Sequence, residues 1–136
     1  MKVGDVVVWD AYGHHRAVVL AVAPTGHAII ACSHVVREMP CVAVLPRTLG
    51  SRSLGWSDTD NRTSHFYPSG LHAVTLNEIR PLHLPGRGTS TPQVRRVNPR
   101  VLVELQATVA RWVREGVVTV ESVCALLPRD DGPKEP

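Results

Sequence analysis

Short apolar runs separated by turn-forming residues fill the first third of the chain. The runs 3–10, 17–22 and 27–33 are rich in Val, Ile and Ala, which favour strands, and Gly13 and Pro24-Thr25-Gly26 lie between them. Short turns between consecutive strands predict an antiparallel meander. A fourth, shorter strand is expected over 42–45, and strand character resumes over 71–84, where Pro81 predicts a sheet edge or a bend.

A helical pattern begins after a further short strand expected over 94–97. Asn98 is a typical N-cap, and Pro99 suits the first helical position. The apolar residues that then fall on one face are Val101, Leu102, Leu105, Val109, Trp112 and Val113. Gly116 ends this helix; a weaker helix is expected over 119–127, followed by a disordered tail from 129.

Five to seven strands followed by a helix predict a mainly β (α+β) fold. The economical architecture is a small, partly open antiparallel barrel whose open side is covered by the helix, because an uncovered sheet would expose its edges. The 136 residues fit one domain. We expect the barrel over 1–115, a polar insert loop over 37–69, and over 116–136 the short helix and tail.

Composition narrows the class of protein. An apolar content of 43% argues against wholesale disorder, and no apolar run approaches the roughly 20 residues of a membrane span. The N-terminus lacks the apolar stretch of a signal peptide, and three cysteines without a Cys-x-x-Cys pair argue against a disulfide framework. We therefore expect a cytoplasmic protein with no membrane contact. Cys32, His34 and Cys41 lack zinc-ligand spacing, so a zinc site is not expected. We expect no cofactor.

Arginine is concentrated in the second half of the chain. Residues 80–114 hold seven arginines and one acid, Glu104, although the net charge is only +3. The planar guanidinium suits bidentate contact with phosphate, which is one interpretation of this pattern. The other is that arginine simply serves as the surface cation.

Several segments, in a fixed order, resemble one known family. They are Val3-Gly4-Asp5-Val6-Val7-Val8-Trp9-Asp10, His15-Arg16-Ala17-Val18-Val19-Leu20, Ile29-Ile30-Ala31-Cys32-Ser33, Gly70 to Arg80 with Asn77-Glu78-Ile79-Arg80 at its end, and Val94 to Val113. Together they resemble the MazF/PemK-type toxins of toxin–antitoxin systems. The resemblance implies an SH3-like barrel that forms a homodimer, cleaves single-stranded RNA without a metal, and is neutralised by an antitoxin protein. Attack by the 2′-OH would leave a 2′,3′-cyclic phosphate and a 5′-OH.

The resemblance also implies catalytic residues. Arg16 matches the family's catalytic arginine and Ser33 its phosphate-binding hydroxyl. Arginine stabilises a phosphorane well but donates protons poorly, so His15 or His34 is a candidate acid or base. For each of these side chains, an ordinary surface or strand-end role is the alternative. Ala17 replaces the family's proline, which weakens the usual setting of the arginine.

RNA-binding candidates come from the aromatic and basic residues. Trp56 and Tyr67, in or beside the long loop, would stack on bases or instead anchor the loop. The arginines proposed to contact phosphate are Arg80, Arg95 and Arg96, and the alternative for the adjacent pair is a charged strand edge.

We therefore expect a toxin-like endoribonuclease in which loop 37–69 selects the RNA sequence. The main rival is a catalytically inactive barrel that binds nucleic acid or a protein partner. A third class is an interaction module whose 119–127 helix forms an oligomer contact.

Overall fold

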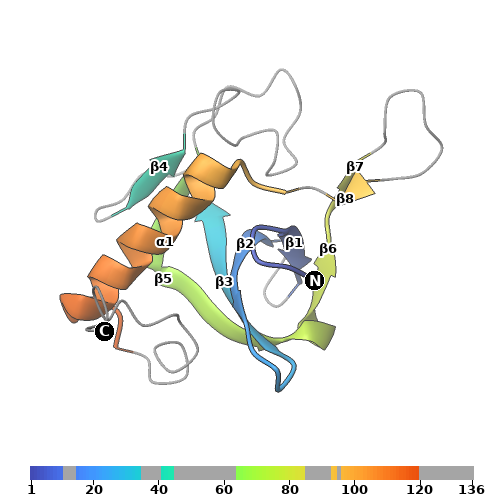
Figure 1. Ribbon diagram of the computed structural model, residues 1–136, viewed down its shortest axis with the longest axis horizontal. Helices are drawn as coiled ribbons and strands as arrows, with labels where there is room; N and C mark the ends of the chain where they lie inside the picture. The colour runs from blue at the N-terminus through green and yellow to red at the C-terminus, as the bar shows by residue number, and fades with distance from the viewer. Residues whose placement is uncertain (11–14, 35–40, 45–63, 85–92, 95, 120–136) are drawn as a thin grey trace, which may run out of the picture.

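The computed structural model describes residues 1–10, 15–34, 41–44, 64–84, 93–94 and 96–119 (Figure 1). Its strands are β1 (Val6–Trp9), β2 (His15–Val22), β3 (His27–His34), β4 (Val42–Val44), β5 (Ser64–Thr75), β6 (Ile79–Pro81), β7 (His83–Leu84) and β8 (Gln93–Val94). A 3-10 turn, η1 (Leu76–Glu78), joins β5 to β6, and one α-helix, α1 (Pro99–Arg114), follows β8. The fold is mainly β with a C-terminal helix, as predicted.

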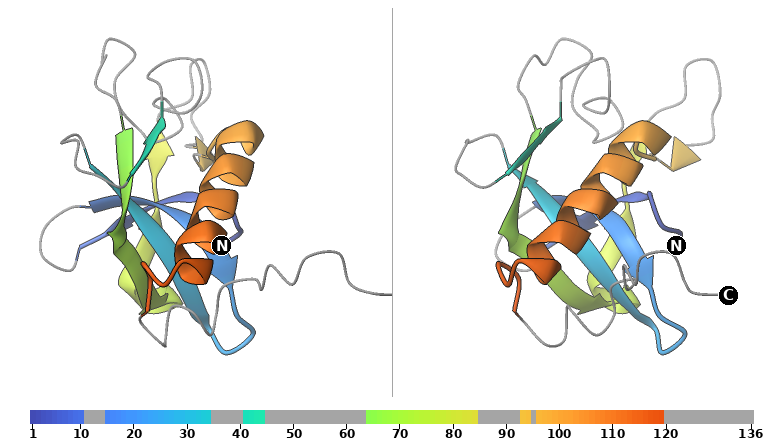
Figure 2. Two further views of the ribbon diagram at one scale, coloured as in Figure 1. Left: turned by 90° about the vertical axis from the view of Figure 1, so that its left-hand side faces the viewer. Right: turned by 60° about the vertical axis from the view of Figure 1, so that its left-hand side comes forward.

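Six antiparallel strands form one sheet in the order β4-β5-β3-β2-β1-β6, and β7 pairs with β8 separately. β5 and β6 are consecutive in the chain but lie four positions apart, which is roughly 19 Å in a flat sheet at about 4.8 Å per strand. The three residues of η1 rise only about 6 Å. The sheet must therefore curl so that β6 reaches β1, which produces the predicted partly open barrel (Figure 2).

Two hydrophobic clusters occupy the two faces of this curled sheet. The first lies under α1, where Leu105 and Trp112 pack against Val18, Ile29 and Phe66. We call this side the helix-covered face. The second cluster, on the opposite face, collects residues from five strands: Val7, Trp9, Ala17, Val19, Ala28, Ile30, Cys32, Val74 and Ile79. Because side chains alternate along a strand, membership of these clusters fixes the face of each neighbouring residue.

The helix begins and ends where the sequence predicts. The side chain of Asn98 accepts a hydrogen bond from the backbone N–H of Arg100 at 2.9 Å, and Pro99 is the first helical residue. At the other end Gly116 has a φ of 73°, a left-handed conformation that favours glycine. A membrane-spanning helix is absent from the described residues: α1, the longest helix, has 16 residues and carries charged side chains.

Several element boundaries differ from the sequence prediction, among them the strand expected over 94–97, which is β8 at Gln93–Val94. Two other differences bear on the site. β5 begins at Ser64, so the last six residues of the predicted insert 37–69 belong to a strand whose Phe66 is 1% exposed. The predicted strand 71–84 is divided by η1, at which the chain turns toward β1. Pro81 lies on the edge strand β6, as predicted. The helix expected over 119–127 and the tail fall almost entirely outside the described residues.

Candidate functional site

The four predicted catalytic residues lie at one end of the sheet, where β2 begins and β3 ends. Ala17 pairs with Cys32 across these strands, so the antiparallel register places Arg16 beside Ser33 and His15 beside His34. Alternation then separates the two pairs. Arg16 and Ser33 lie on the helix-covered face, whereas the histidines lie on the opposite face with Cys32. Sequence reasoning placed the four in one site, and the structure divides them between two faces of one sheet end.

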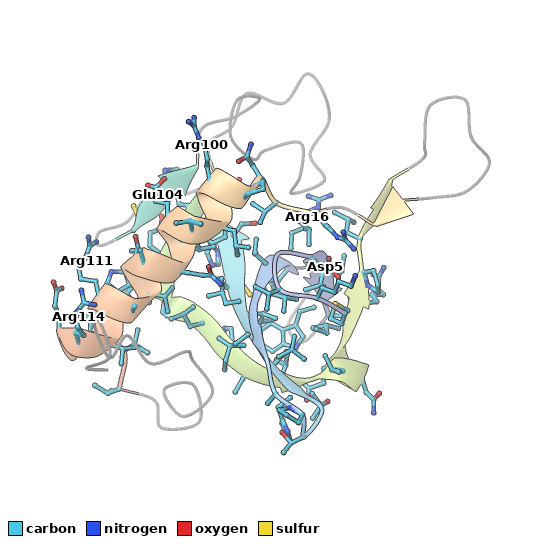
Figure 3. All side chains as sticks on the ribbon, viewed as in Figure 1. Asp5, Arg16, Arg100, Glu104, Arg111 and Arg114 are labelled. Carbon is cyan, nitrogen blue, oxygen red and sulfur yellow. The ribbon has the colours of Figure 1, made fainter. Side chains whose placement is uncertain are left out.

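Arg16 is exposed, and no acidic side chain of the described residues forms an ion pair with it. The hydroxyl of Ser33 donates a hydrogen bond to the main-chain carbonyl of Arg16 at 3.2 Å. This bond uses the hydroxyl proton but leaves oxygen lone pairs free. Figure 3 shows Arg16 at the sheet, away from Arg100, Arg111 and Arg114, which belong to α1. The guanidinium of Arg16 is therefore available to an anion.

A third histidine lies beside His15 and His34 on the opposite face. The ring centroids of His15 and His34 lie 6.4 Å apart, with the rings inclined by 61°. His72, on β5, joins them through Trp9, whose ring centroid is 4.5 Å from that of His72 and 6.1 Å from that of His15. We call His15, His34 and His72 the histidine cluster. It contains one residue that sequence reasoning did not select.

The cluster has an electrostatic signature. Burial lowers the pKa of His72, and the positive charges of His15 and His34 lower it further. His72 therefore resists protonation. Burial raises the pKa of the neighbouring Cys32 thiol to about 12, because burial disfavours the charged thiolate. This thiol therefore acts neither as a thiolate nucleophile nor as a thiolate ligand. No three His, Cys, Asp or Glu side chains in the described ranges converge closely enough to hold a metal ion.

Aromatic and polar groups surround the cluster on β5. Tyr67 is 8% exposed; its ring centroid lies 5.5 Å from that of His34 and 6.4 Å from the stacked ring of His65. This burial favours the interpretation that Tyr67 packs against the barrel as an anchor over the one in which it stacks on a base. Two buried atoms on this face, Trp9 Nε1 and His65 Nδ1, have no hydrogen-bond partner among the residues that the structure describes.

Gly70 makes room for one of the histidines. A Cβ atom at this position would lie 3.4 Å from Nε2 of His34 and 3.3 Å from the carbonyl oxygens of Cys32 and Tyr67. Residues 67–70 lie opposite an irregularity in the β3–β5 register, between Ala31 and Ser33. A methyl group at this point would be crowded by the two carbonyl oxygens and would touch His34, so the absence of a side chain leaves room for this ring.

The predicted RNA-binding arginines that the structure describes are engaged in ion pairs. Arg80 Nε lies 3.2 Å from a carboxylate oxygen of Asp10, and Arg96 Nε lies 3.0 Å from one of Asp5. Both arginine side chains remain more than half exposed, at 58% and 59%. Trp56 and Arg95 lie outside the described residues.

Comparisons with protein-family models, with curated proteins and with solved structures find no match to this chain.

Proposed function

We propose that this protein is a metal-independent endoribonuclease of the toxin type that cuts single-stranded RNA. The observation that carries the proposal is the juxtaposition of His15 and His34, two imidazoles from neighbouring strands with centroids 6.4 Å apart. Imidazole exchanges protons near neutral pH, and cleavage by an internal 2′-OH needs both a base and an acid. The exposed guanidinium of Arg16, next in sequence to His15, adds a positive charge at the same sheet end.

The proposed chemistry assigns each group a task. One histidine removes the proton of the 2′-OH while that oxygen forms a bond to the adjacent phosphorus. The bond from phosphorus to the 5′-oxygen breaks, and the second histidine gives that oxygen a proton. The products are a 2′,3′-cyclic phosphate and a 5′-OH. Arg16 would stabilise the negative charge of a phosphate that passes the end of the sheet, since it is charged at every physiological pH.

Arg16 and the histidines face opposite sides of the sheet, which constrains the RNA path. A strand that crosses the sheet end would meet the histidines on one side and Arg16 on the other. In this arrangement Arg16 contacts a phosphate adjacent to the one that is cleaved. The other elements of the proposal rest on the family resemblance: an SH3-like homodimer, cytoplasmic action, and neutralisation by an antitoxin protein.

The test is incubation of the full chain with long single-stranded RNA in EDTA, followed by mapping of both new ends. We expect discrete cuts with cyclic-phosphate and 5′-OH ends, and no cleavage of DNA of the same sequence, because DNA lacks the attacking 2′-OH. Cleavage of the DNA, or 3′-OH ends on the RNA, would refute the mechanism.

A non-catalytic, nucleic-acid-binding barrel is the second candidate function. It is favoured by the bond from Ser33 to the Arg16 carbonyl, which ties the family's hydroxyl to the backbone, and by Ala17 at the family's proline position. This candidate predicts RNA binding that weakens steeply with salt but leaves the RNA intact. Binding measured at several salt concentrations, beside the cleavage assay, distinguishes the two functions.

A further inference from the structure

We infer that His15, His34 and His72 together form one binding site, and that its ligand is a phosphate of the RNA backbone. The inference rests on the proposed function and deepens it, because it places a phosphate and adds His72. None of the expectations drawn from the sequence includes His72 in a site.

The three side chains come from three adjacent strands and share one face. His72 pairs with Ile30, which belongs to the same hydrophobic cluster as Ala17 and Cys32. His15 is two residues before Ala17, and His34 is two residues after Cys32, so both histidines share that face. Both neighbours lie close enough to shift the titration of His72. Trp9 packs against two of the rings and so fixes their separation. The strands therefore hold the three imidazoles together.

The charges around the cluster favour an anion. The other titratable groups beside the cluster are His65 and Tyr67 of β5 and the thiol of Cys32, and no ion pair between a cluster histidine and a carboxylate is found among the described residues. Asp5 lies at the far end of β1, where it pairs with Arg96. Asp10, at the end of β1, accepts hydrogen bonds from Arg80 at 3.2 and 3.5 Å on the helix-covered face. Protonated histidines here repel one another, and an anion that contacts all three would replace this repulsion with attraction.

The spacing favours an oxyanion over a metal ion. Zinc requires nitrogens that converge to about 2.0–2.1 Å from one point, and no three candidate ligands in the described residues do so. A phosphate accepts charge-assisted hydrogen bonds of about 2.7–2.9 Å on several separate oxygens, so it tolerates more widely spaced donors. The 6.4 Å between the rings of His15 and His34 suits a ligand that lies between them.

Two buried polar atoms beside the cluster favour the interpretation that a ligand binds here. Trp9 Nε1 and His65 Nδ1 are on this face and lack partners within the described part of the chain, although buried polar groups are nearly always hydrogen-bonded. A ligand that reorients the histidines would also allow these neighbouring donors and acceptors to pair. These two atoms therefore lie beside the proposed phosphate site.

The first experiment uses sulfate as the probe, because its charge stays constant across the titration range of histidine. Binding to the full chain is followed in EDTA by the histidine NMR signals, with chloride at equal ionic strength as reference. We expect sulfate to raise the pKa of His72 and to bind about tenfold more tightly when the cluster is protonated than when it is neutral. Affinity that does not change with pH would overturn the inference.

The matched variants are His72→Gln and His27→Gln. Loss of one charge-assisted hydrogen bond should weaken sulfate binding about tenfold in His72→Gln. His27 lies at the start of β3, at its opposite end from His34, and its ring contacts the Thr25 hydroxyl at 3.1 Å, so His27→Gln should bind as the wild type does. Unchanged thermal unfolding shows that each variant is folded. Equal sulfate affinity in a folded His72→Gln would refute the site.

An uncleavable 2′-O-methyl RNA oligonucleotide identifies the source of the phosphate. We expect sulfate to compete with this RNA and His72→Gln to weaken its binding; sulfate binding without competition would assign the site to free oxyanions and refute the inference. Parallel cleavage assays separate the two proposals. If sulfate competes with the RNA but ordinary RNA is not cleaved, the proposed function alone is refuted. If His72→Gln cleaves RNA at the wild-type rate and binds sulfate with the wild-type affinity, this inference alone is refuted.

Discussion

The ion pair between Asp5 and Arg96 joins the start of β1 to the segment before α1, and its two ends should contribute unequally to stability. Asp5 is 4% exposed, and its carboxylate accepts hydrogen bonds from the backbone N–H of Lys2 at 2.9 Å and from Arg96 Nε at 3.0 Å. Arg96 is 59% exposed, so water screens its charge. Hydrogen bonds to charged groups contribute about 1.5–3 kcal/mol each, and exposed pairs about 0–1 kcal/mol. We therefore expect Asp5→Asn to cost about 2 kcal/mol and Arg96→Gln about 0.5 kcal/mol.

A double-mutant cycle in urea measures both ends of this pair. Asp5→Asn, Arg96→Gln and the double variant are unfolded in parallel, and we expect a coupling free energy below about 1 kcal/mol. With an m-value of about 1–3 kcal/mol/M, the loss in Asp5→Asn moves the midpoint by about 1 M. An Arg96→Gln variant as unstable as Asp5→Asn would show that the pair behaves as a buried one and would refute the argument. RNA affinity of Arg96→Gln tests its other predicted role.

The remaining predictions concern the helix cap, the glycine beside His34, and acid stability. Asn98→Ala removes the side-chain acceptor for the Arg100 N–H and should lower the free energy of unfolding by about 1 kcal/mol, measured by urea denaturation, whereas Asn98→Ser should retain most of it. Gly70→Ala brings a methyl group within 3.3 Å of the carbonyl oxygens of Cys32 and Tyr67 and 3.4 Å of His34 Nε2, so it should slow RNA cleavage and weaken RNA binding, and an unchanged rate would contradict the crowding argument. Because the pKa of His72 is lowered in the folded state, the unfolded chain binds this proton more readily; the melting temperature should therefore fall as the pH drops below about 6.5, and less so in His72→Gln.

Local signals in the sequence were sufficient for the helix and for the first three strands. Asn98, Pro99 and Gly116 act within a few residues of their own positions, so their effect is visible in the sequence. The same is true of the β2–β3 turn at Thr25 and Gly26. The partly open barrel followed from the number of strands and the need to cover their edges.

The boundaries of β5 and the third histidine depend on contacts between distant strands. The segment before Leu71 contains polar residues and Pro68, which are typical of a loop, and it becomes a strand because Phe66 enters the core beneath α1. The register irregularity between Ala31 and Ser33 changes the pairing of β5 with β3, from Leu71 opposite Ala31 to Phe66 opposite Ser33. A single sequence does not specify such a shift.

The separation of Arg16 and Ser33 from His15 and His34 follows from the geometry of the strands. Adjacent positions of a strand point to opposite faces, so the predicted alternation could have separated Arg16 from His15. The partners of the arginines could not have been found in this way. Asp5 and Arg96 are 91 positions apart, and Asp10 and Arg80 are 70 positions apart, so these pairs arise only from the curl of the sheet.

The central claim is that histidines at this sheet end cleave RNA by internal 2′-OH attack. The most direct measurement is the rate of RNA cleavage in EDTA, with mapped ends, for the wild type, His34→Gln and the control His27→Gln. The account predicts cyclic-phosphate ends, a loss of about 10²-fold or more in His34→Gln, and an unchanged rate in His27→Gln. Equal rates in wild type and a folded His34→Gln, or intact RNA with the wild type, would contradict it.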